Sequence, residues 1–217
     1  MIRAARLVAL LVLMLASTAP VHAAKPAKSW QATATSADRK RLARLWEAWT
    51  HALAEVEASG QTVEMTGLGP VVVPDAATMH ANTADRLATP AKGPLPGSGD
   101  YRCRTIRLGH HGDTATAARV QAGDTVPCRI EMRGSALWFE QEVGANRLGG
   151  RLFVDGDRMV FLGASALRGE MGVMPYGADP ERNAIGALRA LGPQQWRLEL
   201  PWPAWQSNLD LVEITPR

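Results

Sequence analysis

The stretch "PCRIEMRGSALWFEQEVG", residues 127–144, decides the fold class of the C-terminal part of the chain. Apolar and polar side chains alternate on both sides of its Arg-Gly-Ser turn. The apolar positions are Cys128, Ile130, Met132, Leu137, Phe139 and Val143. A period of two places successive side chains on opposite faces of a strand. The stretch therefore predicts two half-buried antiparallel strands joined by a tight turn.

The same pattern continues to the C-terminus. "QWRLELPW" also alternates, "DRMVFLGASAL" is more uniformly apolar, and "LDLVEI" closes the chain. "GANR", "VDGDR" and "LGPQQ" separate these runs, and Asp-Gly is a strong hairpin signal. About seven or eight short strands with hairpin turns favour an antiparallel β-barrel, lipocalin-like or a related small barrel, with a two-sheet sandwich as the alternative.

One amphipathic helix is predicted before the strands, over residues 38–59. Ser36 is a natural N-cap and Gly60 a natural stop. Apolar residues recur in steps of three and four at Leu42, Leu45, Trp46, Trp49, Leu53 and Val56. Such a stripe packs on a core. We expect the helix to pack on the barrel through Trp46 and Trp49.

The N-terminal residues predict export. Arg3 and Arg6 precede the uncharged run "LVALLVLMLA", and "VHA" has small residues at the usual cleavage spacing of a signal peptide. The apolar run is shorter than the roughly 20 residues of a membrane-spanning helix. We expect a periplasmic or secreted protein with no transmembrane segment after cleavage behind Ala24.

Four segments follow from these patterns. They are a signal peptide (1–24), an N-terminal segment with the helix (25–60), a Gly/Pro-rich connection (61–100) and the antiparallel β domain (101–217). Residues 25–35 and the connection are expected to be loosely ordered.

Cys103 and Cys128 are the only cysteines. An even cysteine count in an exported chain favours a disulfide, which here would tie two strands of one wall. A zinc site would need more ligands, and the adjacent His110 and His111 would point to opposite faces of a strand. No metal and no cofactor are expected.

The segment "PYGADPERN", residues 175–183, interrupts the strand pattern and is the best candidate for a special loop. Tyr176, Asp179, Glu181 and Arg182 are its candidate binding residues. The same run is typical of a helix start, with Asp179 as the cap and a proline in the first turn. In "PWPAWQ", Trp202 and Trp205 either line a pocket at the barrel mouth or pack at the barrel end.

A candidate basic patch lies on the two cysteine-bearing strands. Its members are Arg102, Arg104, Arg129 and Arg133, with Arg107 beside them. A shared outer face of arginines suits anionic groups. The alternative is a solvated face on which the arginines pair with Glu131 and Glu140.

Several longer runs resemble a family of exported bacterial proteins, the domain of unknown function 4893. They are "GDYRCRTIRLG", "CRIE", "GRLFVDGDRMVFLGA", "PYGADPERNAIGALRALGPQQWRLELPWP" and "LDLVEI". The resemblance begins near residue 30 and includes the tryptophan-bearing helix. It implies an exported location and both cysteines, and it supplies no activity, cofactor or catalytic residue.

The composition excludes a strongly basic nucleic-acid binder. Loss of Arg3 and Arg6 leaves 22 of the 24 basic residues against 21 acidic ones, a net charge of +1. No Gly-x-Ser-x-Gly, His-Glu-x-x-His or phosphate loop occurs. The sequence favours a non-catalytic, monomeric binding or interaction module for a small apolar ligand or an envelope protein. The alternatives are a periplasmic hydrolase built on Asp179 to Arg182 and a structural cell-envelope factor.

Overall fold

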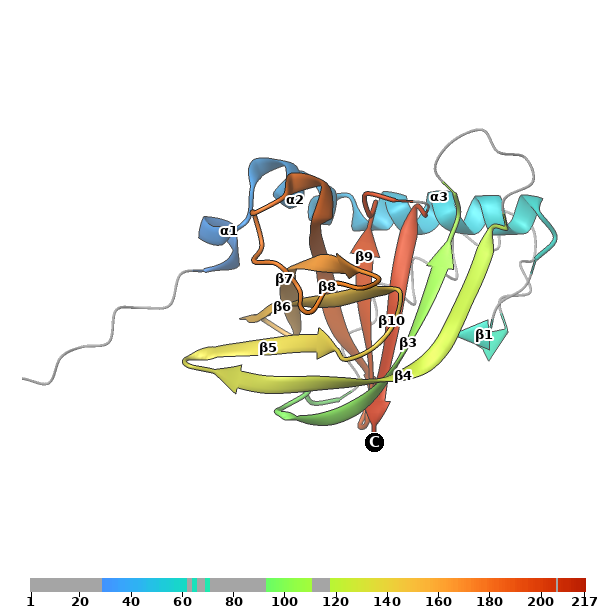
Figure 1. Cartoon of the computed structure of the whole chain (residues 1–217). Coiled ribbons are helices and arrows are strands. Elements are labelled where there is room, and N and C mark those ends of the chain that lie inside the picture. The colour runs from blue at the N-terminus through green and yellow to red at the C-terminus, as the bar shows by residue number, and fades with distance from the viewer. Residues whose placement is uncertain (1–28, 62–63, 66–68, 71–92, 111–117, 206) are drawn as a thin grey trace, which may run out of the picture.

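The structure, a computed structural model, describes residues 29–61, 64–65, 69–70, 93–110, 118–205 and 207–217. Eight of its strands close into an antiparallel barrel (Figure 1). The barrel strands are β3 (Gly99–Leu108), β4 (Val120–Arg133), β5 (Ala136–Gln141), β6 (Asn146–Asp155), β7 (Arg158–Leu167), β8 (Asn183–Gly192), β9 (Gln195–Pro201) and β10 (Leu209–Pro216). Each strand pairs with the next along the chain, and β10 closes the barrel against β3. The predicted antiparallel barrel is confirmed, and the sandwich alternative is wrong.

Short turns set the strand register. β6 and β7 pair from Asp155 opposite Arg158, across the turn that "DGD" predicted. Gly156 has a φ of +69° there, in the left-handed region that glycine adopts without strain. β1 (Glu64–Met65) and β2 (Gly69–Pro70) form a separate two-stranded pair.

The barrel interior is a packed apolar core. Its buried residues are Tyr101, Cys103, Cys128, Ile130, Phe139, Leu148, Leu152, Met159, Phe161, Leu188, Ala190, Trp196, Leu198, Leu200, Val212 and Ile214. Phe139 and Phe161 meet edge to face with centroids 6.0 Å apart, which is a favoured aromatic geometry. Large side chains therefore fill most of the interior. Met132 and Val143 were expected on this face but are exposed, because Met132 lies next to the end of β4 and Val143 lies beyond β5.

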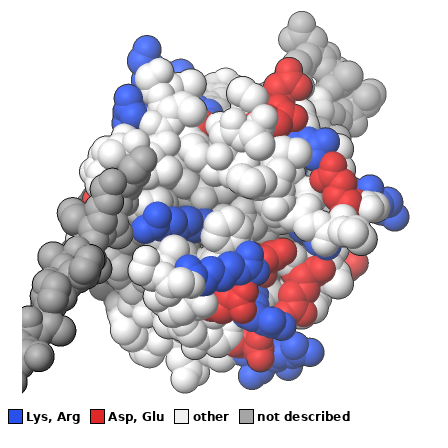
Figure 2. Space-filling view, turned by 60° about the vertical axis from the view of Figure 1, so that its left-hand side comes forward, with Lys and Arg blue, Asp and Glu red and all other residues white. Residues whose placement is uncertain are grey.

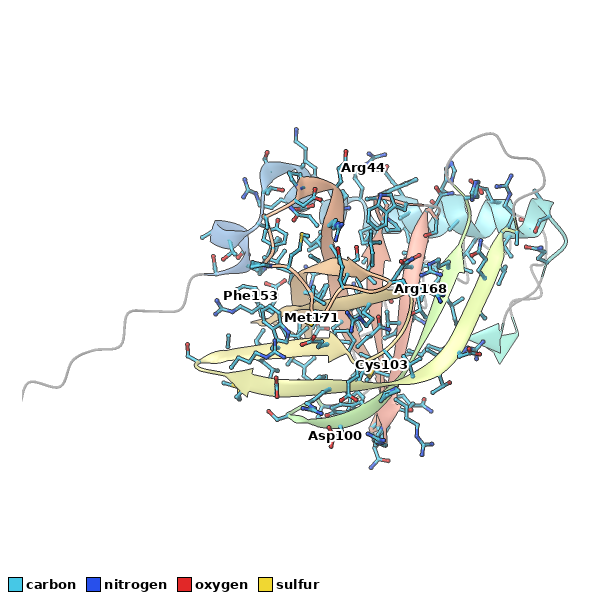
Figure 3. All side chains as sticks on the ribbon, viewed as in Figure 1. Arg44, Asp100, Cys103, Phe153, Arg168 and Met171 are labelled. Atoms are coloured by element: carbon cyan, nitrogen blue, oxygen red, sulfur yellow. A yellow bond between two sulfur atoms is a disulfide. The ribbon has the colours of Figure 1, made fainter. Side chains whose placement is uncertain are left out.

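The disulfide belongs to this core. Cys103 on β3 and Cys128 on β4 are bonded, with Cα atoms 5.9 Å apart (Figure 3). Their strands pair directly, with Cys103 opposite Val126. The predicted disulfide is confirmed, and it is consistent with an extracellular or periplasmic location.

The helical segment differs from the single helix expected over residues 38–59. It forms α1 (Trp30–Thr33), α2 (Ser36–Ala43) and α3 (Leu45–Ala58), so part of the segment expected to be loose is helical. Thr35, rather than Ser36, caps α2. The chain breaks at Arg44, where φ is −99° and ψ is 19°. Contacts of α2 with β8 and of α3 with β9, β10 and β3 hold the two helices in different directions, and these tertiary contacts override local helix propensity.

The helices cover one outer wall of the barrel, and α3 crosses β9, β10 and β3 in Figure 1. The buried face of α3 is formed by Leu45, Ala48, Trp49, Ala52, Leu53 and Val56. Trp49 is 0% exposed, as the stripe predicted, whereas Trp46 is 40% exposed. The prediction for Trp46 is wrong because, at about 100° per residue, Trp46 falls at the edge of the arc that the buried residues of α3 form.

Three sequence predictions fall outside the described residues. They concern the signal peptide (1–24), most of the connection (61–100) and the side chain of His111. The first barrel strand begins at Gly99, two residues before the expected start of the β domain.

Candidate binding site at the barrel mouth

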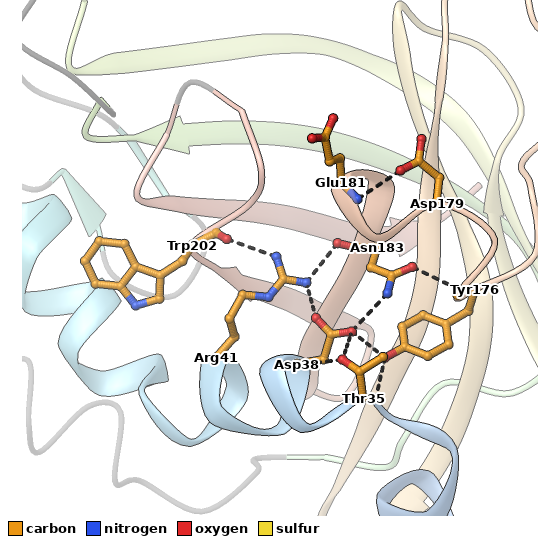
Figure 4. Close-up of polar contacts among 9 residues, drawn as sticks. Thr35, Asp38, Arg41, Tyr176, Asp179, Glu181, Asn183 and Trp202 are labelled. Carbon is orange, nitrogen blue, oxygen red and sulfur yellow. Dashed lines mark hydrogen bonds and ion pairs between the residues drawn. The ribbon is translucent and has the colours of Figure 1, made fainter.

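The predicted loop forms a compact turn before β8 (Figure 4). Pro180–Arg182 is a single turn of 3-10 helix, and the Asp179 carboxylate accepts a hydrogen bond of 3.0 Å from the Glu181 N–H. Arg182 forms ion pairs with Glu170 at 2.5 Å and with Asp179 at 3.5 Å. The predicted cap at Asp179 and the acidic partner of Arg182 are both present.

Asp38 anchors this loop to the helices. Its carboxylate accepts hydrogen bonds from the Tyr176 hydroxyl, the Thr35 hydroxyl and the Asn183 amide (Figure 4). Burial alone would raise the pKa of Asp38, but these hydrogen bonds and the charge of Arg41 lower it below its usual value. Tyr176 therefore has a structural role, joining the start of α2 to the loop.

Arg41 holds Trp202, which belongs to the predicted segment "PWPAWQ", in place. Its guanidinium donates to the carbonyl of Trp202 at 3.0 Å and to the carbonyl of Asn183 at 2.8 Å. Trp202 has a φ of +47°, an uncommon conformation for a residue other than glycine. Its ring lies edge-on to His51 and near Arg44. Trp202 thus packs between the barrel end and the helices.

A polar pocket opens at this end of the barrel, between the turn at residues 180–182 and the loop after β9. Its enclosed space is about 60 Å³, room for roughly four water-sized groups. Arg107, Asp210 and Trp205 line it, together with the polar residues Thr105, Asn146, Ser165, Glu181 and Arg182 and with apolar residues of β6, β8, β9 and the loop after β9. The mouth is therefore charged, whereas the barrel below it is apolar.

Arg107 and Asp210 form the charged wall of this pocket. They lie opposite each other on β3 and β10, with Arg107 Nε 3.7 Å from Asp210 Oδ2. Asp210 also accepts a hydrogen bond from the Ser207 hydroxyl. Deeper in the barrel, the buried amide of Gln141 donates to the Thr105 hydroxyl at 3.1 Å. The pocket thus has a polar floor. The Arg107 guanidinium and the Asp210 carboxyl group lie above it on adjacent strands.

Burial raises the pKa of Asp210 to about 6, although Ser207 and Arg107 act in the opposite direction. The side chain is 16% exposed, so the carboxylate has lost most of its hydration. An acid held in a cleft at a cost to stability is typical of a functional site.

Asp210→Asn is expected to stabilise the protein more at pH 8 than at pH 4. The folded protein binds the Asp210 proton more tightly than the unfolded chain, so the carboxyl favours folding at low pH and loses this contribution as the pH rises through about 6. The variant does not titrate there, so its stability relative to the wild type should rise by up to about 3 kcal/mol between the two pH values. Urea denaturation at both pH values measures the difference, with Asp157→Asn on the exposed β6–β7 turn as the control. An equal difference at both pH values would contradict the burial of the charge.

The structure separates the predicted site residues into two groups. Glu181, Arg182 and Trp205 line the mouth pocket, whereas Asp179 and Trp202 are used in local packing and capping. Sequence reasoning missed Asp210 and placed Arg107 beside the outer basic patch, whereas Arg107 lines the mouth pocket. Strand parity carried a signal for both, because Arg107 is in phase with the inward Cys103 and Asp210 is in phase with the inward Val212.

Two members of the candidate basic patch, Arg129 and Arg133, form ion pairs with acidic neighbours. Arg129 pairs with Asp100 and Glu142, and Arg133 pairs with Glu131 and Glu140, at 2.6–3.2 Å. Blue and red side chains lie side by side over the lower part of the face in Figure 2. This arrangement favours the alternative reading of the patch, a solvated sheet face with paired charges.

The described residues offer neither a group of metal ligands nor a helix that could span a membrane. In the described parts of the chain, no three His, Cys, Asp or Glu side chains are close enough to hold a metal ion. Among the helices that the structure describes, none is both long and apolar enough to cross a membrane. His110 follows β3, and its backbone N–H donates to Glu55 at 2.9 Å.

Asp179→Ala is expected to lower the free energy of unfolding by about 0.5–2 kcal/mol, because the Glu181 N–H loses its acceptor. Glu181→Ala removes an equal charge from the same exposed turn and should cost less than about 0.5 kcal/mol. Thermal denaturation of the two variants makes the comparison. Equal melting temperatures would show that the cap contributes nothing.

The fold and the pocket together define the chain as a closed up-and-down β-barrel protein with helices on its outer wall and a polar pocket at one end. The chain belongs to the family described as Domain of unknown function (DUF4893), which matches residues 30–214. Neither the curated proteins nor the solved structures contain a sequence or fold that matches it.

Proposed function

We propose that this protein is an exported, monomeric, non-catalytic binding module that holds a small polar ligand at the barrel mouth. The observation that carries the proposal is the Arg107–Asp210 pair at the polar end of an otherwise apolar barrel. Binding pockets typically combine a shaped cavity with a few convergent polar groups.

The chemistry of the pocket selects the class of ligand. Arg107 supplies N–H donors for an anionic acceptor, while Asp210 and the floor hydroxyl of Thr105 can accept from a hydroxyl or an ammonium group. A hydroxy acid or an amino acid carries both functions. The enclosed space fits its polar end, and the remainder would rest against Trp205 at the rim.

An apolar ligand inside the barrel has less support than this polar one. Packed side chains such as Phe139, Phe161 and Trp196 occupy the interior below the mouth. The hydrolase alternative also has less support, since Asp179 caps the turn and Arg182 is held by Glu170.

Isolation of the protein from its exported compartment tests this function. We expect a polar small molecule to be enriched with the wild type after rapid purification, denaturation and mass spectrometry. Arg107→Gln should lose it, because the donor to the anionic group is removed. Arg129→Gln, on the outer wall, is the matched control and should retain it. Equal amounts from the wild type and Arg107→Gln would contradict the proposal, and a stoichiometric protein partner without a small molecule would replace it.

A further inference from the structure

A second cleft lies between the helices and the outer wall of the barrel. Its volume is about 570 Å³, within the range of small-ligand sites, and it shares no lining residue with the mouth pocket. Three tryptophans line it, Trp30, Trp46 and Trp49. Trp46 is the side chain that α3 leaves exposed, so the aromatic surface is accessible from solvent.

Buried polar atoms border this aromatic surface. Glu199 is 0% exposed, and its Oε1 accepts from Arg197 at 2.8 and 3.0 Å. Its Oε2 has no hydrogen bond within the described residues and lies 3.7 Å from Arg189 Nε. The indole N–H groups of Trp30 and Trp49 likewise have no acceptor in the part of the chain that the structure describes. These polar atoms lie below the accessible surface, so they make the wall behind the cleft polar without being open to a ligand themselves.

The charge of the cleft is positive. Arg39, Arg158 and Arg189 line it, and of these Arg158 pairs with Asp155 at 3.0 Å and Arg189 lies 3.7 Å from Glu199. Arg39 donates to the backbone carbonyls of Gln31 and Ala34, at 2.9 and 2.6 Å, and it forms no ion pair with an acidic residue in the part of the chain that the structure describes. Guanidinium groups on the rim favour a ligand that carries carboxylates.

We propose that this cleft binds an acidic oligosaccharide. The C–H faces of sugar rings pack on flat indole surfaces, and Trp46 supplies such a surface at the opening. Uronate carboxylates pair with the rim arginines. A fatty acid would provide the charge but no ring face to pack on Trp46.

Isothermal titration of the full chain with tetragalacturonate tests the assignment. We expect saturable binding that weakens at least about three-fold between about 20 mM and about 300 mM salt, because the rim arginines contribute electrostatically. Trp46→Ala should weaken binding about ten-fold or more, and Arg39→Gln should weaken it and reduce the salt dependence. Because Trp46 and Arg39 are exposed, both variants should remain folded, as circular dichroism will verify.

Trp205→Ala, at the barrel mouth, is the matched tryptophan control and should bind tetragalacturonate as the wild type does. This control separates the cleft from the proposed function of the mouth. Absence of heat of binding at millimolar tetragalacturonate, or an unchanged affinity in folded Trp46→Ala, would overturn the proposal. Equal affinity for neutral maltotetraose would overturn the acidic class, and capture of a peptide in place of either sugar would assign the cleft to a protein partner.

Discussion

Replacing Trp49 with alanine is expected to lower the free energy of unfolding by about 3–5 kcal/mol. Trp49 is among the largest fully buried side chains, and its ring packs beneath the helix against the Arg197 guanidinium, 5.0 Å from the ring centroid. Truncation leaves a cavity and removes the cation–π contact of Arg197, whose ion pair with Glu199 is itself buried. Urea denaturation followed by circular dichroism measures the loss.

Trp46→Ala is the matched control, one helical turn earlier on the exposed edge of α3. It should cost clearly less than Trp49→Ala, because 40% of the Trp46 surface stays exposed in the folded protein, whereas Trp49 is fully buried. Equal losses for the two variants would contradict the described orientation of α3. A small loss for Trp49→Ala would show that the helix does not pack on the barrel.

Loss of the Cys103–Cys128 bond is expected to lower the free energy of unfolding by about 2–5 kcal/mol. The bond joins residues 25 apart in sequence and lies in the closed core of the barrel. Without it, the unfolded chain gains conformational freedom that the cross-link otherwise removes. The double variant Cys103→Ser/Cys128→Ser, compared with the wild type in denaturant, measures the change.

Reduction of the wild type provides the control for the serine side chains, since it breaks the bond without changing the sequence. It should reproduce most of the loss seen in the double variant. Thiol labelling of unreduced, denatured wild type should find no reactive cysteine. Two reactive thiols per chain would contradict the disulfide.

The strands were predictable because a single physical constraint acts on them. A half-buried strand must alternate its side chains, so "PCRIEMRG" showed its period directly. "QWRLELPW" also alternates, but β9 is buried on both faces, because α3 packs on this strand and Arg197 and Glu199 are buried. The helix break at Arg44 had no such signal, since neither proline nor glycine is present there. It depends on the contacts that Asp38 and Arg41 make with residues more than 100 positions away.

The mouth pocket was only partly predictable for a similar reason. Arg107 and Asp210 are adjacent because β10, the last strand, closes the barrel against β3, the first. No local motif reports a pairing between the two ends of a domain. Trp205 and Arg182 were predicted because their loops interrupt the alternating pattern of the strands. The hydrogen bond from Tyr176 to Asp38 could not be predicted, because it depends on where the helix packs.

A nuclear magnetic resonance titration of the labelled protein tests the central claim, that the barrel mouth binds a small polar ligand, most directly. The probes are lactate, malate, serine and glutamate, added separately to the wild type and to Arg107→Gln. We predict that at least one probe shifts the resonances of Arg107, Asp210 and the Trp205 indole N–H in a saturable manner, and that Arg107→Gln abolishes the shifts. Saturable shifts confined to other surfaces, or shifts at the mouth that persist unchanged in Arg107→Gln, would contradict it.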